Sequence, residues 1–204
     1  MPEIIAYSEH VLPLCHPLIV PDRELIARFM EPMLLLRTDK LPEGEGWLYE
    51  VKFDGYRALA IKSGGQVRLR SRNDKDFTKR YPGVVAALRE LPDETVIDGE
   101  VAALDATGKP VFSQLQNGGT NVHFYVFDVL MLAGENMTGE PLVTRRHVLE
   151  RKILPKLPEP IRCSPILDAA LPDLIQSIRR RAWKGWWQSA PRAGTKRDSV
   201  RAHG

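Results

Sequence analysis

The amino-acid sequence predicts an α+β domain, in which antiparallel sheets are flanked by helices. Two observations indicate this class. Five strand-like segments lie between residues 47 and 132, and tight turns separate the first three, which favours antiparallel pairing. Helical segments are few and mostly late, and they do not alternate regularly with the strands as a parallel sheet requires. The 204 residues, 43% of them hydrophobic, are enough to bury a core.

The strands are predicted from runs of β-branched and aromatic residues that lie between turn signals. Asp54-Gly55 and Ser63-Gly64-Gly65 are typical hairpin turns, and they separate the first three segments. Two longer segments of similar composition follow. The predicted strands cover residues 47–53, 56–62, 66–70, 95–104 and 122–132.

The clearest helix is predicted to begin at Pro82 and to end near Leu91. Proline is favoured in the first turn of a helix, and Val84, Leu88 and Leu91 would share one apolar face. Further helical segments are predicted at 21–31, 112–116, 144–154 and 172–181, with a proline-rich connector over 155–172.

Composition excludes several classes of protein. No apolar run approaches the roughly 20 residues of a membrane-spanning helix, and the first twenty residues lack a basic start before an apolar stretch. Cys15 and Cys163 make neither a disulfide framework nor a zinc cluster. We therefore expect a cytoplasmic protein without membrane association.

The net charge of +3 conceals an uneven distribution. Residues 179–204 carry eight basic side chains and one acidic one, a charge of +7, whereas the preceding 178 residues carry −4. Three of the four tryptophans also lie in this tail. A basic, aromatic segment is typical of nucleic-acid binding.

The stretch around Lys52 is the most informative part of the chain. Alternate side chains share a face of a strand, so Glu50, Lys52 and Asp54 should point one way, and Tyr49 and its apolar neighbours toward the core. One interpretation is a solvated hairpin with a charged outer face. The other is a nucleophilic lysine, which attacks only as the neutral amine and needs burial or cationic neighbours such as Arg57.

The segment Lys52–Arg57 resembles the Lys-x-Asp-Gly-x-Arg nucleophile motif of the covalent nucleotidyltransferases, the superfamily of DNA ligases, RNA ligases and mRNA capping enzymes. Three later segments, residues 70–78, 96–101 and 124–130, resemble its arginine, glutamate and aromatic motifs in the same order. The lead-in formed by residues 32–34 and 47–50 is similar to that of bacterial ATP-dependent DNA ligases, which include the ligase domain of the end-joining ligase D.

This resemblance implies a covalent nucleotidyltransferase (ATP-grasp-like) core, and an enzyme that uses ATP with Mg²⁺ or Mn²⁺ to seal nicked or broken double-stranded DNA. It implies that Lys52 attacks ATP and forms lysyl-AMP. It further implies a bacterial, nucleoid-associated repair protein with end-joining proteins as candidate partners, and we expect a monomer. By the same resemblance, Glu50 recognises the adenine amino group, Phe127 stacks on the base, and Gly55 contacts the nucleotide in the turn. Arg57 and Arg72 contact ribose or phosphate. Glu100 contacts ribose or metal, and Asp54 orients the lysine or the metal.

Two superfamily motifs are missing from residues 133–204, a Glu-Gly-x-Val-x-Lys segment and a later strand with a catalytic lysine. The oligonucleotide-binding (OB) barrel that follows them in the superfamily is absent as well. We therefore expect a truncated domain with impaired nick sealing. The predicted organisation is a lead-in over 1–30, an incomplete adenylation domain over 31–178 and a basic tail over 179–204.

The tail indicates a displaced reading frame. When the codons for residues 182–190 are read one base earlier, they force Glu, Val and Ala at three places. They also allow Leu-Glu-Gly-Leu-Val-Ala-Lys-Arg, which contains the missing motif. We therefore expect a one-base displacement near residues 172–182. Two alternatives to a DNA ligase stay open, namely a non-catalytic remnant that binds nucleotide or DNA, and an RNA ligase or capping-type nucleotidyltransferase.

Overall fold

The computed structural model describes residues 3–8, 25–33, 47–116 and 121–167 of the chain. Strands make up much of this part. They are β1 (Glu3–Ser8), β2 (Trp47–Lys52), β3 (Tyr56–Ser63), β4 (Gln66–Ser71), β5 (Thr95–Ala103), β6 (Val122–Leu132), β7 (Glu135–Asn136) and β8 (Ile161–Cys163).

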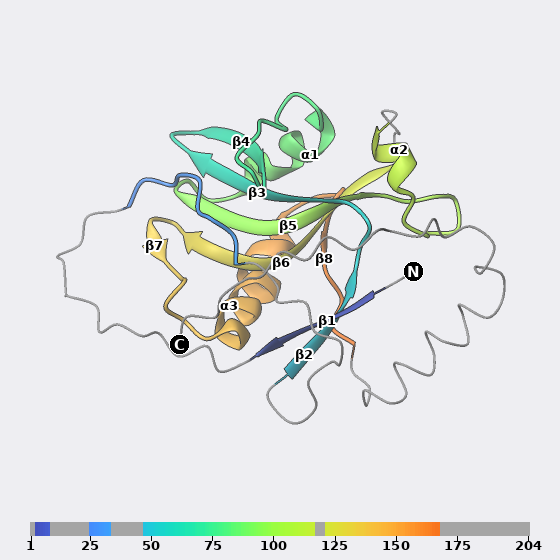
Figure 1. Cartoon of the computed structure of the whole chain (residues 1–204). Coiled ribbons are helices and arrows are strands. Elements are labelled where there is room, and N and C mark those ends of the chain that lie inside the picture. The colour runs from blue at the N-terminus through green and yellow to red at the C-terminus, as the bar shows by residue number, and fades with distance from the viewer. Residues whose placement is uncertain (1–2, 9–24, 34–46, 117–120, 168–204) are drawn as a thin grey trace. The chain divides into compact units, whose positions relative to one another are not determined.

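The strands form two sheets (Figure 1). The larger has the order β4-β3-β5-β6-β7, with β8 also paired to β6, and the smaller consists of β1 and β2. All these pairings are antiparallel except that of β6 with β8, which is parallel. The α+β class predicted from the sequence is therefore confirmed.

The helices are short and lie between or after the strands. The first, α1 (Pro82–Ala87), begins at its proline as predicted and continues into a 3-10 turn (Leu88–Glu90). The short helix α2 (Phe112–Gln116) has the predicted bounds. The third, α3 (Leu142–Val148), continues through a π-helical turn (Leu149–Ile153) and a 3-10 turn (Leu154–Lys156), so the helical stretch begins two residues before the predicted one.

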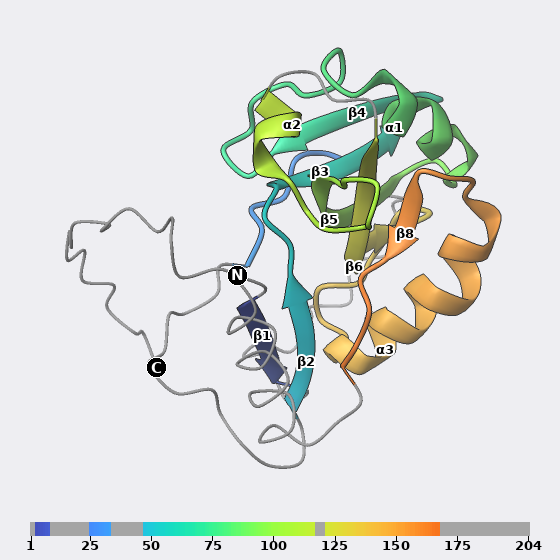
Figure 2. The same cartoon turned by 90° about the vertical axis from the view of Figure 1, so that its right-hand side faces the viewer.

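The main core lies between one face of the large sheet and the helices α1 and α3, which are on the same side of the sheet in Figure 2. Leu88 and Leu149 from the helical segments are fully buried against Ile97 of β5 and against Phe124 and Val126 of β6. Burial of each such side chain contributes about 1.5–3 kcal/mol relative to exposure, so this layer fixes the sheet that carries the site.

The opposite face of the sheet is covered by an extended segment, residues 25–33, which we call the strap (Figure 1). Ala27 packs in a second cluster with Leu59 of β3 and Met131 of β6. The backbone of the strap is anchored as well, because Leu25 N donates to Gly134 O at 3.2 Å and Ala27 N donates to a carboxylate oxygen of Glu94 at 2.5 Å.

Three expectations about elements are wrong. The helix predicted over 21–31 is absent from 25–31, where sheet burial and the contacts with Gly134 and Glu94 favour extended backbone. The Asp54-Gly55 turn does not close a hairpin, since β2 and β3 belong to different sheets. The predicted connector contains β8, which is only three residues long and borders prolines. The helix predicted over 172–181 lies outside the described residues.

Candidate functional site

Lys52 is the last residue of β2, and the chain then crosses from the small sheet to the large one through Asp54 and Gly55. The side chains of Lys52 and Asp54 are exposed. A Cβ atom at Gly55 would lie 2.2 Å from Val101 O in β5, so only glycine allows this close approach of the crossing to β5. The Lys-x-Asp-Gly-x-Arg motif therefore spans a tight crossing between the two sheets, with Lys52 at the end of β2 and Arg57 in β3.

Glu100 of β5 lies against this crossing, since a Cβ atom at Gly55 would be 3.0 Å from Glu100 Cγ, and it is in register with Arg57 of β3. Its pKa is raised to about 7 by burial, and this rise is opposed by a hydrogen bond from Gly55 N and by the charges of Lys52 and Arg57. The negative charge of the nearby Asp54 carboxylate raises the pKa of Glu100 further. The structure thus brings four predicted site residues, Lys52, Asp54, Arg57 and Glu100, within electrostatic reach of one another.

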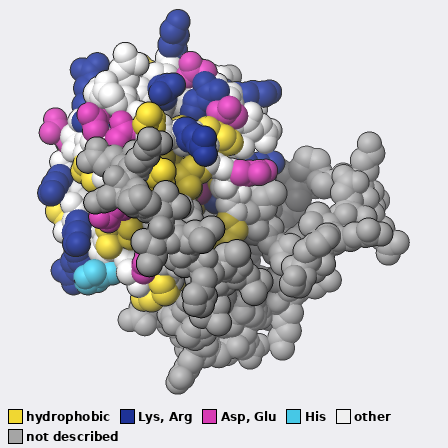
Figure 3. Space-filling model, turned by 90° about the vertical axis from the view of Figure 1, so that its left-hand side faces the viewer, with side chains coloured by type: hydrophobic (Ala, Val, Ile, Leu, Met, Phe, Trp, Pro, Cys, Tyr) yellow, Lys and Arg dark blue, Asp and Glu magenta, His cyan; other side chains and the backbone are white. Residues whose placement is uncertain are grey.

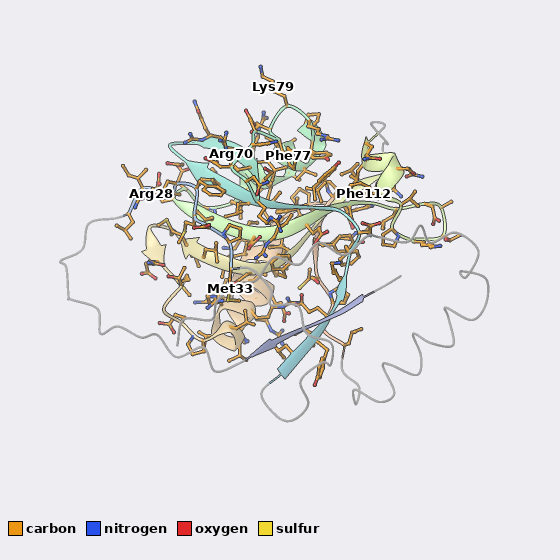
Figure 4. The ribbon with its side chains drawn as sticks, in the orientation of Figure 1. Arg28, Met33, Arg70, Phe77, Lys79 and Phe112 are labelled. Carbon is orange, nitrogen blue, oxygen red and sulfur yellow. The ribbon has the colours of Figure 1, made fainter. Side chains whose placement is uncertain are left out.

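Arg57 is held in place from several directions. Its Nε and Nη2 atoms donate to the two carboxylate oxygens of Asp98 at 3.2 and 2.7 Å, and Nη1 donates to Met33 O at 2.7 Å. Its guanidinium carbon lies 5.3 Å from the centroid of the Phe127 ring, within the range of a cation–π contact. Figure 4 labels Met33, at the end of the strap, near α3. The strap therefore contributes directly to the position of Arg57.

A cavity of about 270 Å³ opens beside Arg57, close to the lower end of the roughly 300–1,000 Å³ that is typical of small-molecule sites. We call it the base cavity. Its apolar wall is formed by Met30, Met33, Leu48, Phe127, Leu130 and Leu142. Its polar wall is formed by Glu31, Glu50, Arg57, Asp98, Asp128, Thr138, Arg145 and Arg146.

Glu50 differs from its expected setting on a charged outer face. It is only 3% exposed, although Lys52 and Asp54 on the same side of the passage are exposed. Arg146 forms an ion pair with its carboxylate, and Ser164 Oγ donates to it at 3.2 Å. Burial raises the pKa of Glu50 to about 7, against the lowering effects of Arg146 and Ser164. The interpretation of a solvated charged face is therefore wrong for Glu50, whereas it holds for the exposed Lys52 and Asp54.

The other predicted site residues are also near this region. Phe127 lies in the wall of the base cavity, and Arg57 covers part of its ring. Arg72 is exposed at the turn after β4, and its backbone N donates to Arg57 O at 3.2 Å. On the apolar side of β2, Tyr49 is buried as expected, and Phe53 stacks on Tyr125 with ring centroids 3.9 Å apart.

Sequence reasoning missed the two arginines of α3. Arg145 donates to both oxygens of Asp128 at 2.8 Å, and Arg146 pairs with Glu50; both arginines are buried. Arginines in a helix are usually solvated, so they gave no signal of their own. Asp128 inside the apolar strand β6 was the available signal for Arg145, because a buried carboxylate requires a cationic partner.

Charge alone does not mark a partner surface on the face shown in Figure 3. Over the coloured part of that face, Lys and Arg side chains are interspersed with Asp and Glu side chains. Within the residues that the structure describes, no cluster of three or more His, Cys, Asp or Glu side chains could hold a metal ion. The same residues contain no helix long and apolar enough to span a bilayer.

The antiparallel core, with the Lys52 motif at the crossing between its two sheets, is consistent with a nucleotidyltransferase domain. A family model described as "ATP dependent DNA ligase domain" matches residues 32–184, and the chain belongs to this family.

The relatives include multifunctional end-joining proteins. The chain is 46% identical over 107 residues to the non-homologous end joining DNA repair protein LigD of Mycobacterium tuberculosis, covering 51% of this chain and 14% of that protein. It is 34% identical over 163 residues to LigD of Pseudomonas aeruginosa, covering 77% of this chain and 19% of that protein. It is 36% identical over 142 residues to DNA ligase C1 of Mycolicibacterium smegmatis, covering 61% and 41%.

Solved structures agree with this family. The ligase domain of M. tuberculosis LigD superposes with a TM-score of 0.58 at 36% identity, covering 67% of this chain and 46% of that domain. A mycobacterial DNA ligase D complexed with ATP and MES superposes with the same score and identity, covering 45% of that chain. The present chain thus spans less than half of these ligase domains and less than a fifth of the LigD proteins.

Proposed function

We propose that this chain is the adenylation domain of a DNA ligase and that Lys52 carries AMP from ATP to DNA. The observation that carries the proposal is the group formed by Lys52, Arg57 and Glu100, where three elements meet beside the base cavity. The resemblance of this segment to the nucleotidyltransferase nucleophile motif, together with the family membership, supports the same chemistry.

The proposed reaction begins with the neutral Lys52 amine. Its nitrogen attacks the α-phosphorus of ATP, a nitrogen–phosphorus bond forms, and the bond to the bridging oxygen breaks, so that pyrophosphate leaves with the electron pair. The amine proton passes to solvent. An oxygen of the 5′-phosphate at a DNA break then attacks the AMP phosphorus, the nitrogen–phosphorus bond breaks and the Lys52 amine is regenerated. The 3′-hydroxyl oxygen finally attacks the 5′-phosphorus, loses its proton to solvent and displaces AMP. Such displacements depend mainly on positioning and on charge neutralisation, which Arg57 and Arg72 would supply.

The residues at the passage suit a nucleotide and a divalent cation. The base cavity offers the Phe127 ring and an acceptor carboxylate for a base, while Asp54 and Glu100 offer oxygen ligands close to Lys52. Mg²⁺ is commonly held by one or two carboxylates together with substrate phosphates, so the absence of a larger acidic cluster among the described residues fits this use. The cation would neutralise phosphate charge.

Incubation with ATP labelled at the α-phosphate, in the presence of Mg²⁺, tests the proposal. We expect covalent label on the wild-type chain, at low yield, and none on Lys52→Ala, because no other amine replaces the nucleophile. Lys62→Ala is a matched control, since Lys62 of β3 donates to Arg89 O and Leu91 O at 2.8 and 2.7 Å on another part of the sheet. Equal labelling of wild type and Lys52→Ala would contradict the assignment.

We further propose that the biological substrate is nicked or broken DNA in bacterial end joining, within the cytoplasm. This rests on the LigD relatives, whose names specify non-homologous end joining. Because the chain spans only part of those proteins, end-joining partners and nick sealing are proposed for the whole ligase rather than for these 204 residues.

The tail is proposed to be out of frame. Its support is the codon arithmetic of residues 182–190, which forces Glu, Val and Ala in the neighbouring frame and allows the whole of Glu-Gly-x-Val-x-Lys. Nucleotide sequencing across residues 165–204 is expected to find that motif one base away. A gene whose neighbouring frames encode no such segment would leave the tail as a genuine basic segment. Its deletion would then be expected to abolish a salt-sensitive affinity for DNA.

A further inference from the structure

The strap contributes Met30, Glu31 and Met33 to the lining of the base cavity. It also holds one of the predicted site residues, because Met33 O accepts a hydrogen bond from Arg57 Nη1 at 2.7 Å. The position of the strap therefore decides where this part of the cavity wall lies. It decides equally whether Arg57 keeps one of its acceptors.

Side-chain packing accounts for only part of the attachment of the strap. Ala27 is buried, but it offers a single methyl group, and Leu25 and Ile26 before it are 47% and 75% exposed. Phe29 and Met30 are only partly buried where they pack against the sheet. Hydrophobic stabilisation grows with the apolar area removed from water, so the attachment also depends on hydrogen bonds to the backbone of the strap.

The carboxylate of Glu94, directly before β5, receives one of these hydrogen bonds. It accepts from Ala27 N in the strap. The same carboxylate accepts from Ser63 Oγ at 3.0 Å and from Gly64 N at 3.2 Å, at the turn between β3 and β4. One side chain therefore joins the strap to a turn of the large sheet.

The backbone of Glu94 takes part in the attachment and is strained. Its oxygen accepts from Gly134 N at 2.9 Å, and Gly134 O accepts in turn from Leu25 N. The φ angle of Glu94 is 53°, in the left-handed region that residues with a side chain seldom adopt. Glycine would suit this backbone better. A glutamate at this position is therefore explained by the contacts of its carboxylate rather than by the needs of the turn.

We propose that Glu94 is a positioning residue of the nucleotide site, which anchors the strap to the sheet and so keeps Met30, Met33 and Arg57 in place around the base cavity. The inference rests on the proposed function, because the strap affects affinity only if this cavity takes a nucleotide. Glu94 itself does not line the cavity, so it would act through the strap.

Anchoring of the strap and nucleotide binding should be coupled in both directions. If the anchored strap favours nucleotide binding by some factor, a bound nucleotide favours the anchored strap by the same factor. The charge needed for anchoring is present at neutral pH, because the hydrogen bond from Ala27 N, with those from Ser63 and Gly64, holds the pKa of Glu94 below its usual range.

Equilibrium binding of ATP, together with hydrogen exchange in residues 25–33, tests the inference on the full chain in the Lys52→Ala background, where no covalent adduct forms. We expect ATP to slow exchange of the Leu25 and Ala27 amides. Glu94→Gln keeps the length of the side chain but loses one acceptor oxygen and the charge. It should weaken ATP binding about fivefold or more and speed exchange in the strap. Exchange in β3 and β5 should stay unchanged, which distinguishes release of the strap from general unfolding.

Two further variants separate positioning from stability. Glu94→Gly relieves the backbone strain while it removes the carboxylate, so it should unfold at a urea concentration no lower than Glu94→Gln does and still lose ATP affinity. Asp93→Asn is the matched control, since Asp93 accepts from Gly65 N at 3.0 Å and lies 3.9 Å from Lys62 Nζ, contacts that belong to the β3–β4 hairpin. Its ATP affinity and strap exchange should equal those of the parent chain.

Faster strap exchange in Glu94→Gln with an unchanged ATP affinity would overturn the inference, and so would unchanged strap exchange. An equal loss of affinity in Asp93→Asn would do the same. If Glu94→Gln does not fold, Glu94→Gly decides the question. Failure of the proposed function would look different: the parent chain would bind no ATP and the wild type would take up no covalent label, and the inference would fall with it.

Discussion

An Arg57→Ala substitution is expected to lower the free energy of unfolding by about 3–5 kcal/mol. The side chain of Asp98 is only 3% exposed and receives two hydrogen bonds from Arg57, at 3.2 and 2.7 Å. Removal of the arginine leaves a carboxylate buried without its cation, and it also removes the donor to Met33 O and the contact with Phe127. Urea denaturation followed by circular dichroism measures the loss.

Two comparisons separate this effect from simple truncation of a side chain. Arg70→Ala removes an exposed ion pair with Asp74, and such pairs contribute about 0–1 kcal/mol. The double variant Arg57→Ala/Asp98→Ala removes both charges, so it should be less destabilised than the sum of the single variants. A loss for Arg57→Ala no larger than for Arg70→Ala would show that the pair does not support the fold.

Gly99→Ala is expected to be the most disruptive single-methyl change in the sheet. A Cβ atom at this position would lie 2.5 Å from Tyr125 O and 2.7 Å from Phe124 Cε2, in the neighbouring strand β6. The backbone oxygen cannot move without separating β5 from β6. We expect a loss of about 3 kcal/mol in the free energy of unfolding, and weaker nucleotide binding because Asp98 and Glu100 flank the position.

Gly83→Ala provides the control for Gly99→Ala. Gly83 lies in the first turn of α1, and a Cβ atom there would meet nothing within 4 Å. Alanine has the higher helix propensity, so stability should be unchanged or should rise by about 0.5–1 kcal/mol. If both variants are equally stable, the close approach of β5 and β6 at Gly99 is less tight than the distances indicate.

Local sequence patterns predicted most of the large sheet. Its central strands alternate or are uniformly apolar, and the glycines at 64 and 65 adopt the positive φ angles that such a turn requires. Pairing between distant segments left no such local signal. The Asp54-Gly55 turn has the same composition as a hairpin turn, but β1, whose residues were not recognised as a strand, pairs with β2 in place of β3.

The site shows the same division. The residues of the Lys52 motif were found because their spacing resembles a known motif, and the structure gathers Lys52, Asp54, Arg57 and Glu100. Their assigned roles stay predictions. The setting of Glu50 was not predictable, because it depends on Arg146 and Ser164, which approach it only through tertiary packing.

The anchoring of Glu50 also has a consequence for synthesis of the chain. Arg146 follows Glu50 by 96 residues and Ser164 follows it by 114. At a translation rate of about 5–20 residues per second, the ribosome takes on the order of ten seconds to extend the chain from β2 to β8. During that interval the hydrophobic strands of the large sheet can already pair, while the Glu50 carboxylate still lacks Arg146 and Ser164. The buried setting of Glu50 can therefore form only after β8 has been made.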